Sequence, residues 1–475
     1  MAAFQITDFF IYRARYIIGY GIIGLLLVAL LAFAGFFVPG GLSDNEIAAV
    51  VRSDAINWSN ASTYTITHLP FHLLQQLSLD LFGVHNWSIK LPSLIIGLLS
   101  AIGLIVLFNQ WFKQRIALIA SFIAITTGQF IFVAQSGNPS IMYIFLTIWL
   151  LVFATLIARA SRWKFLWRIL FFVFVAMSIY TPLSIYVLIA IALTVFLHPH
   201  LRYLLRQMSK LKLIGAFILS AIILVPLVTG IIRDPSLGLT LLGIPGTLPD
   251  IPANIMVLLK QYFLFWQPSS SPLMTPVFGF GSMLLIGMGF YFLLKTRETS
   301  QSYLIIIWLL CLLPVLILNP DFTSVMFVPM VLLLALGING LIGYWYRLFP
   351  KNPYARITAL LPLAVLFGTL GFAGFDRYVH GYYYDPGTAT HFSRDLRLLP
   401  RDVPNVVVSQ DQQAFYQVVA HHTPAMTVST APNSDRFVAT RDAMQSFEGY
   451  TIERIITSNR QADADRFYVY TKNDQ

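Results

Sequence analysis

Apolar runs of about 20 residues recur between residues 16 and 375, and they limit this chain to one class of fold. Each run is long enough for a helix to cross the hydrocarbon core of a bilayer. The 475 residues are 57% hydrophobic and only 11% charged, whereas a soluble protein carries about 25% charged residues. The sequence therefore predicts a polytopic α-helical membrane protein.

The number of spans depends on the longest apolar run, residues 165–197. This run is too long for one typical membrane helix, and Pro182 interrupts it, where proline breaks or kinks a helix. We therefore expect two short spans that meet at Thr181 and Pro182. The prediction is about 11 transmembrane helices, at residues 16–38, 87–108, 116–134, 140–158, two within 165–197, 214–232, 277–294, 303–318, 325–346 and 357–375.

The basic residues provide a test of this topology. They cluster in alternate connections: Lys113 and Arg115; Arg159, Arg162, Lys164 and Arg168; Arg202, Arg206, Lys210 and Lys212; Lys295 and Arg297; Arg347, Lys351 and Arg356. Positively charged loops stay in the cytoplasm. All of these clusters fall on one side only if residues 165–197 cross the membrane twice. The N-terminus is then cytoplasmic and the segment after the last span is extracytoplasmic.

The net charge of +10 does not indicate a nucleic-acid partner, because it is spread over these short clusters between apolar runs. The single cysteine, Cys311, lies inside an apolar run and excludes an intrachain disulfide.

The composition changes after residue 375, where charged and polar residues become frequent and no further span follows. We expect two domains: a transmembrane domain of residues 1–375 and a small extracytoplasmic α+β domain of residues 376–475. The pattern predicts strands at 406–408, 426–429, 451–457 and 466–470, with helices at 412–420 and 434–447. A further helix is expected at 251–266, within the loop 233–276.

The first outer loop, residues 39–87, carries an acidic pair just beyond the first span. Ser43 and Glu46 have the spacing of a capping box, and Asp44 favours the N-terminus of the helix that follows. A local capping role is therefore one interpretation. Carboxylates at a membrane edge are also often functional. Asp44 or Glu46 could be a general base that deprotonates an acceptor hydroxyl, and capping is compatible with that role.

His68 and His72 open an amphipathic segment of the same loop. Pro70 suits the first turn of a helix, and leucines at helical spacing predict a helix in the membrane interface. The two histidines share a helix face, which is an acceptable spacing for metal ligands. Because no matched acidic partner lies on that helix, an interfacial or substrate-binding role is the preferred interpretation over a metal site.

Three further polar residues lie at the same membrane face. Lys90 begins the second span, where it either snorkels to the interface or meets a lipid phosphate. Gln135 and Asn138 belong to the tight turn at residues 135–139. Glycine, asparagine and proline are ordinary turn residues there, and the alternative is that Gln135 and Asn138 bind sugar hydroxyls.

Together these segments resemble the polytopic glycosyltransferases of family 39 and their bacterial relatives, the protein-mannosyltransferase-like and aminoarabinose-transferase-like enzymes of the GT-C fold. The resemblance covers residues 16–200, and the rest of the chain by hydropathy only. The residues that carry it are Asp44 and Glu46, the His68-Leu-Pro70 segment, residues 81–83 and 89–97, and Ala134-Gln-Ser136.

The resemblance implies a GT-C fold, a polyprenyl-phosphate sugar as donor, an inverting displacement, and an active site on the outer face of a plasma membrane. It also implies that the aspartate of an Asp-Glu pair is the base. In this chain Asn45 splits the pair, so either carboxylate can be aligned with that aspartate. We expect Asp44 to be the base and Glu46 to support it. Lys90 and Gln135 stand where relatives often have arginine, and Asn138 lies near a position that is acidic in some.

The leading hypothesis is therefore a membrane glycosyltransferase whose acceptor hydroxyl, on a protein, lipid or glycan, attacks the anomeric carbon of the donor. Lys90 or Arg52 would meet the phosphate that leaves, although Arg52 also suits a plain surface position. Some relatives use a divalent metal ion, which stays open as a cofactor although no residue here demands one. The alternatives are a transporter or flippase of lipid-linked glycans and an inactive scaffold of cell-envelope assembly. Transporters usually show repeated halves and polar, broken helices at the midplane. The absence of a repeat in this sequence favours the enzyme.

Overall fold

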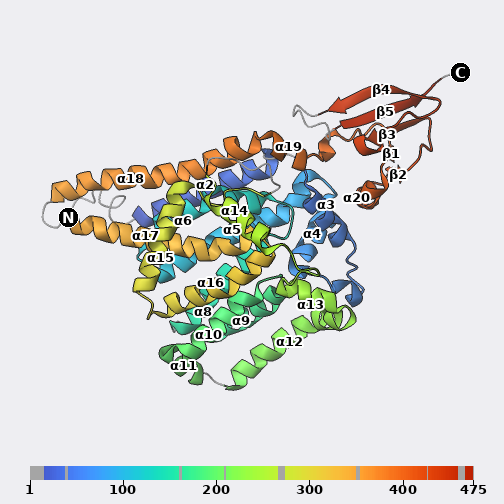
Figure 1. The fold of residues 1–475 in the computed structure, drawn as a ribbon. Helices are drawn as coiled ribbons and strands as arrows, with labels where there is room; N and C mark the ends of the chain where they lie inside the picture. The colour runs from blue at the N-terminus through green and yellow to red at the C-terminus, as the bar shows by residue number, and fades with distance from the viewer. Residues whose placement is uncertain are drawn as a thin grey trace, which may run out of the picture.

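The fold is a large helical bundle with a small sheet domain at one end (Figure 1). The computed structural model describes residues 15–37, 41–159, 163–207, 210–265, 273–348, 353–424, 426–457 and 466–473. The predicted end of the first span at residue 38, the start of the first outer loop at 39–40 and the predicted helix end at 266 lie outside these residues.

Each predicted span corresponds to a helix or to a bent pair of helices. The bundle helices are α2 (Arg15–Phe37), α5 (Asn86–Trp111), α6 (Gln114–Ile125), α7 (Gly128–Gln135), α8 (Ile141–Ala158), α9 (Lys164–Ile179), α10 (Ile185–Leu197), α11 (Pro199–Arg206), α12 (Lys210–Arg233), α15 (Phe280–Lys295), α16 (Ser300–Leu318), α17 (Phe327–Leu348) and α18 (Pro353–Asp376). Within the described residues, seven helices are long and apolar enough to cross a membrane, or up to nine if each of two bent pairs forms one span. The number 11 stays a prediction.

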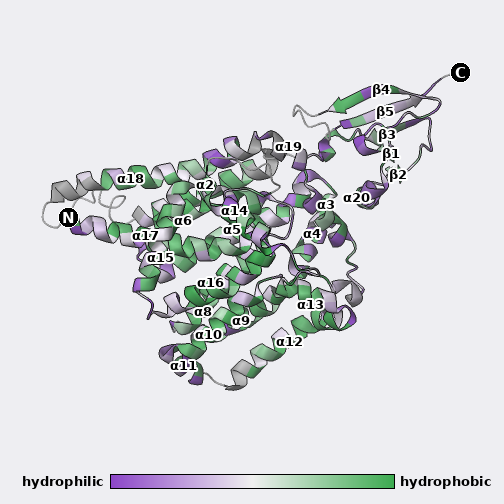
Figure 2. Cartoon of the chain, viewed as in Figure 1, coloured by the Kyte–Doolittle hydropathy of each residue, from purple (hydrophilic) through white to green (hydrophobic). Residues whose placement is uncertain are grey.

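The bundle presents an apolar surface on its outside, as a lipid environment requires. Helices α2, α12 and α18 leave large apolar side chains exposed, among them Leu25, Phe217 and Phe372, and Figure 2 shows hydrophobic residues along these helices. Helices α8 and α17, in contrast, bury most of their side chains inside the bundle. The bundle is thus organised around α8 and α17.

Two breaks in the helices shape the end of the bundle that carries the sheet domain. The predicted break at Pro182 is confirmed, because α9 and α10 are separated by residues 180–184. The span predicted at residues 116–134 is not one straight helix: α6 and α7 meet at an angle of 59°. Thr127 caps α7 by accepting a hydrogen bond from the amide of Phe130 at 3.4 Å. A capping threonine in an apolar run therefore starts a new helix here.

Short helices cover this end of the bundle. The first loop forms α3 (Asp44–Asp54) and α4 (Leu69–Phe82), and the later loop forms α13 (Pro235–Leu242) and α14 (Ile251–Phe263). Helix α4 has 14 residues and is too short to span a bilayer, as expected for an interfacial helix.

The C-terminal part is the small α+β unit that the sequence predicts. After α18 come a π-helix (Arg377–Tyr383) and α19 (Pro386–His391), and then a five-stranded sheet with α20 (Gln410–His421). The strands are β1 (Asn405–Val407), β2 (Thr427–Ser429), β3 (Arg436–Thr440), β4 (Tyr450–Thr457) and β5 (Arg466–Lys472), in the order β2-β1-β3-β5-β4. Strands β1, β2 and β3 are parallel to one another, and β5 is antiparallel to β3 and β4.

The helix predicted at residues 434–447 is wrong. Residues 436–440 form β3 at the centre of the sheet, followed by one turn of 3₁₀-helix at Arg441–Ala443. Four consecutive residues of β3, from Phe437 to Thr440, are buried. A strand covered on both faces has no polar–apolar alternation, so its pattern alone did not distinguish it from a helix.

The sheet domain and the first loop share one hydrophobic cluster. Leu42, Val50 and Leu79 of the loop pack in the same group as Val406 and Phe415 of the domain. An isolated antiparallel bridge also joins the two parts: the Leu42 amide donates to the Arg394 carbonyl at 2.7 Å, and the return hydrogen bond is 3.3 Å. The first loop therefore lies between the bundle and the sheet domain and contacts both.

Candidate functional site

Helix α3 begins with the predicted capping box. The Ser43 side chain accepts from the Glu46 amide at 3.4 Å, and the Glu46 carboxylate accepts from the Ser43 amide at 2.8 Å. This start fixes the rotation of α3, so that neighbouring side chains point in different directions. Glu46 is fully buried, while Asp44 and Asn45 are exposed.

Glu46 is bound on both of its oxygens. One accepts from Ser43, through the amide and the hydroxyl, and the other accepts from the Gly137 amide at 2.5 Å. The Lys90 ammonium lies 3.8 Å from the second oxygen in a pair that is almost completely buried, with side-chain exposures of 1% and 0%. The carboxylate therefore connects α3 to the turn after α7 and to the start of α5.

Lys90 and Gln135 belong to this buried network. The Lys90 ammonium donates to the Gly41 carbonyl at 3.2 Å and to the Gln135 side-chain oxygen at 3.1 Å. In the part of the chain that the structure describes, Glu46, Lys90 and Gln135 line neither of the two cavities that border α3. The structure thus brings these three predicted residues together, but inside the protein.

The first cavity, called here the bundle cavity, has a volume of about 340 Å³ and lies between α3, α4, α7, α8 and residues 321–324. The predicted residues Arg52, His68, His72 and Asn138 line it. The exposed carboxylate of Asp321 lines it as well. Asn138 also makes the turn that the sequence suggests, because its side-chain oxygen accepts from the Ser140 amide at 3.0 Å.

Four residues that line the bundle cavity have a buried polar atom without a partner in the part of the chain that the structure describes. His68 Nδ1, His72 Nε2, Gln129 Oε1 and the Tyr143 hydroxyl are buried and have no hydrogen-bond partner among the described residues. Buried polar groups in proteins are normally hydrogen-bonded. Four residues that line one cavity therefore each carry a buried polar atom without a partner among the described residues.

The two histidines are neutral groups at this cavity. Burial lowers the pKa of His68 to about 3, with smaller contributions from His72 and Arg52. Burial, followed by the charge of Arg52, lowers the pKa of His72 to about 4. His72 Nδ1 lies 2.9 Å from the hydroxyl of Ser53, which donates to Gln75 at 2.7 Å. At neutral pH these imidazoles can exchange hydrogen bonds with a ligand but add no charge.

Arg52 is the cation that borders this site. It makes no hydrogen bond or ion pair with any described residue, and its side chain is exposed. Arg52 also lines a second cavity, called here the domain cavity, which has a volume of about 700 Å³ and lies between α3, α20 and the residues Arg394 and Asp442. Asp44 lines this domain cavity. Helix α3 is therefore a wall between two cavities, with Arg52 reaching both and Asp44 on the domain side.

The sequence did not single out Gln129, Tyr143 or Asp321 as residues of the site. Gln129 and Tyr143 lie in predicted spans, where a polar side chain is costly and often functional, so their polarity was the available signal. Their common position with His68 depends on the bend between α6 and α7, which the apolar pattern of the sequence did not indicate. His68 and His72 have no third metal ligand within reach among the described residues.

Comparison with known proteins identifies the fold. Residues 69–228 match the sequence model of a family described as dolichyl-phosphate-mannose-protein mannosyltransferase. The structure is similar to that of ArnT from Cupriavidus metallidurans bound to undecaprenyl phosphate, with a TM-score of 0.53 and 12% identity over 98% of this chain and 100% of that chain. The apo form of the same protein gives a TM-score of 0.52. A search of curated proteins finds no match.

The structure is also similar to the Archaeoglobus fulgidus oligosaccharyltransferase tethered with an acceptor peptide. The TM-score is 0.52 and the identity 14%, and the match covers 87% of this chain and 64% of the archaeal one. This chain thus spans less than two thirds of that enzyme's length. At these identities the likeness establishes the architecture. The chain is a multi-pass membrane protein with the GT-C fold, which confirms the fold inferred from the sequence.

Proposed function

We propose that this GT-C protein is a membrane glycosyltransferase that takes a sugar from a polyprenyl-phosphate donor in the bundle cavity and passes it to an acceptor in the domain cavity. The observation that carries the proposal is the position of α3 between the two cavities, with Arg52 lining both and Asp44 lining the second. A transferase that joins a lipid-linked donor to a separate acceptor needs two binding spaces that meet at the reacting atoms.

The bundle cavity suits the donor in its chemistry. Phe132 and Phe322 provide apolar walls, while His68, His72 and Asn138 provide polar groups. Arg52 supplies the charge for a phosphate, because a guanidinium binds phosphate oxygens through two donors at once. The similar ArnT structure holds undecaprenyl phosphate, which supports a polyprenyl phosphate as the lipid part of the donor.

In the proposed reaction an acceptor hydroxyl attacks the anomeric carbon of the donor sugar. A bond forms between the acceptor oxygen and that carbon, and the bond from the carbon to the phosphate oxygen breaks. The polyprenyl phosphate leaves with the electron pair and is stabilised by Arg52, and Asp44 accepts the proton of the hydroxyl. A single displacement of this kind inverts the anomeric configuration.

Glu46 has a positioning role in this proposal. Both of its oxygens are occupied and the residue is buried, so it holds α3, and with it Asp44, at the correct rotation. Lys90 and Gln135 complete the same network and set the ends of α5 and α7. This assigns Asp44 as the base and separates the two carboxylates by function.

The proposed topology follows the charge pattern. The N-terminus is cytoplasmic, both cavities open on the outer face of a plasma membrane, and the sheet domain is extracytoplasmic. Every segment that lines the two cavities belongs to connections or helix ends that the basic clusters assign to the outer side. The donor and acceptor would then meet on the outer side.

The test is transfer of labelled sugar in membranes, from a panel of polyprenyl-phosphate sugars, by the wild type and by Asp44→Asn. Asp80→Asn is the matched control, because Asp80 is an exposed residue of the same loop. Its carboxylate accepts a hydrogen bond from the Trp58 indole N–H. We expect transfer to disappear in Asp44→Asn and to persist in Asp80→Asn. Equal transfer by both variants would contradict the assignment of the base, and transport of the intact lipid-linked sugar without transfer would favour a flippase.

A further inference from the structure

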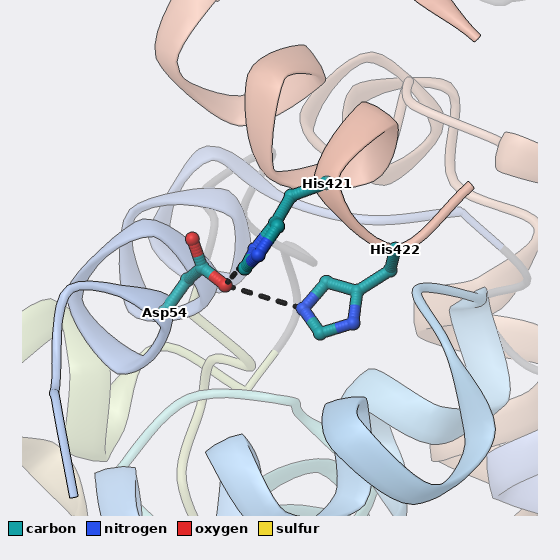
Figure 3. A group of neighbouring side chains, drawn as sticks. All are labelled: Asp54, His421 and His422. Carbon is teal, nitrogen blue, oxygen red and sulfur yellow. Dashed lines mark hydrogen bonds and ion pairs between the residues drawn. The ribbon is translucent and has the colours of Figure 1, made fainter. Parts of the chain in front are cut away.

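A cluster of three potential metal ligands joins the first loop to the sheet domain (Figure 3). Asp54 is the last residue of α3, His421 is the last residue of α20, and His422 follows it as the C-cap. The Asp54 carboxylate oxygen Oδ1 lies 3.3 Å from His421 Nδ1 and 3.2 Å from His422 Nε2. Both rings thus turn toward the same oxygen, as Figure 3 shows.

These separations match those of ligand atoms around one metal ion. Zinc is bound by histidine nitrogen and carboxylate oxygen at about 2.0–2.1 Å in tetrahedral sites, which places two ligand atoms about 3.3 Å apart. A charge-assisted hydrogen bond between a histidine and a carboxylate is shorter, at about 2.7–2.9 Å. The pair formed by His380 and Asp376 shows that shorter distance, 2.8 Å. The contacts at Asp54 are longer than this pair and have the spacing of a metal-ligand set.

The chemistry of the set selects the kind of ion. Two imidazoles and one carboxylate suit zinc and neighbouring divalent transition metals, whereas calcium and magnesium prefer oxygen ligands throughout. Three protein ligands leave a fourth position for water in a tetrahedral site. Asp54 and His422 are partly buried, with exposures of 22% and 12%, and the exposed His421 closes the site from outside.

We propose that Asp54, His421 and His422 form a site for a divalent transition-metal ion, with zinc as the preferred ion, that fastens the sheet domain to the first loop. The same two helices are opposite walls of the domain cavity, which is lined by Asp44 and Val51 from α3 and by Phe415 and Tyr416 from α20. A metal at their C-terminal ends fixes the spacing between them. The ion is structural in this arrangement, and the site does not depend on the proposed transfer reaction.

The test uses the full chain in detergent, purified through a tag without histidine and stripped with a chelator. After dialysis against Zn²⁺, bound metal is measured by elemental analysis and its affinity by competition with a chromophoric chelator. We expect one zinc per chain in the wild type. Asp54→Asn, His421→Asn and His422→Gln should each lose this high-affinity site. Co²⁺ should give the visible absorption of a tetrahedral complex in the wild type and not in these variants.

His380→Gln is the matched control, because His380 pairs with Asp376 without a third ligand among the described residues. This variant should bind zinc as the wild type does. Thermal unfolding separates loss of the site from loss of the fold: the metal-free wild type and the three ligand variants should unfold at similar temperatures, and added Zn²⁺ should raise only that of the wild type. Absence of zinc binding by the wild type, or binding unchanged in the ligand variants, would overturn the proposal and leave an ordinary ion pair.

Discussion

Removing the charge of Glu46 should destabilise the protein, because this carboxylate is the centre of a buried network. In Glu46→Gln the shape is kept, but the Lys90 ammonium loses the buried carboxylate that lies 3.8 Å away. At an effective dielectric of about 20 the attraction over this distance is about 4 kcal/mol. Breaking a buried pair on one side costs about 3–5 kcal/mol in measured cases, so the two magnitudes agree.

The amide of the new glutamine also meets the wrong partners. Its NH₂ group must face a backbone N–H, either that of Ser43 or that of Gly137, whichever way the amide is turned. A loss of about 3–5 kcal/mol is a large fraction of a typical folding free energy of about 5–15 kcal/mol. We therefore expect Glu46→Gln to unfold at a clearly lower temperature than the wild type.

The assay is thermal unfolding in detergent, followed by intrinsic fluorescence, together with the yield of folded protein from membranes. Asp44→Asn is the control two residues away, and its exposed side chain should leave the unfolding temperature unchanged. The double variant Glu46→Gln/Lys90→Met removes the buried ammonium together with the carboxylate and should recover part of the loss. An unfolding temperature of Glu46→Gln equal to that of the wild type would contradict a stabilising role of the Glu46–Lys90 pair. A double variant as unstable as the sum of Glu46→Gln and Lys90→Met would contradict it as well.

Three further outcomes follow from the geometry. Arg52→Gln should raise the KM for the donor by about 10- to 100-fold, because it removes the free energy of one charged hydrogen bond to phosphate. The unfolding temperature should change little, and an unchanged KM would show that Arg52 does not bind the donor. Burial lowers the pKa of His72 to about 4 in the folded protein, so the folded state binds this proton less readily than the unfolded state does. The neutral His72 therefore stabilises the fold fully above about pH 6.5, and this stabilisation of about 3 kcal/mol is lost as the pH falls toward 4. His72→Asn should flatten this part of the stability–pH curve, and an equally steep curve would contradict the burial of a neutral imidazole. Gly41→Ala should cost about 1–3 kcal/mol, because a Cβ there would collide with the Phe392 carbonyl beside the bridge that joins loop and domain; unfolding at the wild-type temperature would show that this junction can shift.

Local features of the sequence predicted local structure well. The capping box at Ser43 and Glu46 and the break at Pro182 depend on residues a few positions apart, and both are present. The apolar runs predicted the bundle helices for the same reason. The bend at Thr127 was missed because a single threonine in an apolar run is a weak signal, and its capping role needs the geometry of the chain around it.

The arrangement of the site depends on contacts that no local pattern contains. Glu46 bonds Gly137, which is 91 residues away, so the sequence could not show that one carboxylate of the pair is buried and the other exposed. Asp54 meets His421 across 367 residues, and neither residue belonged to a recognisable metal motif. Both cases involve α3, whose position between bundle and sheet domain is a property of the tertiary fold.

We propose distinct roles for the two carboxylates in the first turn of α3, with Asp44 acting on the acceptor and Glu46 holding the helix. The most direct measurement is sugar transfer per folded molecule by Asp44→Asn and by Glu46→Gln, with the folded fraction taken from the unfolding assay. We expect Asp44→Asn to be folded but inactive, and the activity of Glu46→Gln to fall only as far as its folded fraction falls. A folded but inactive Glu46→Gln, together with an active Asp44→Asn, would contradict these roles and assign the base to Glu46.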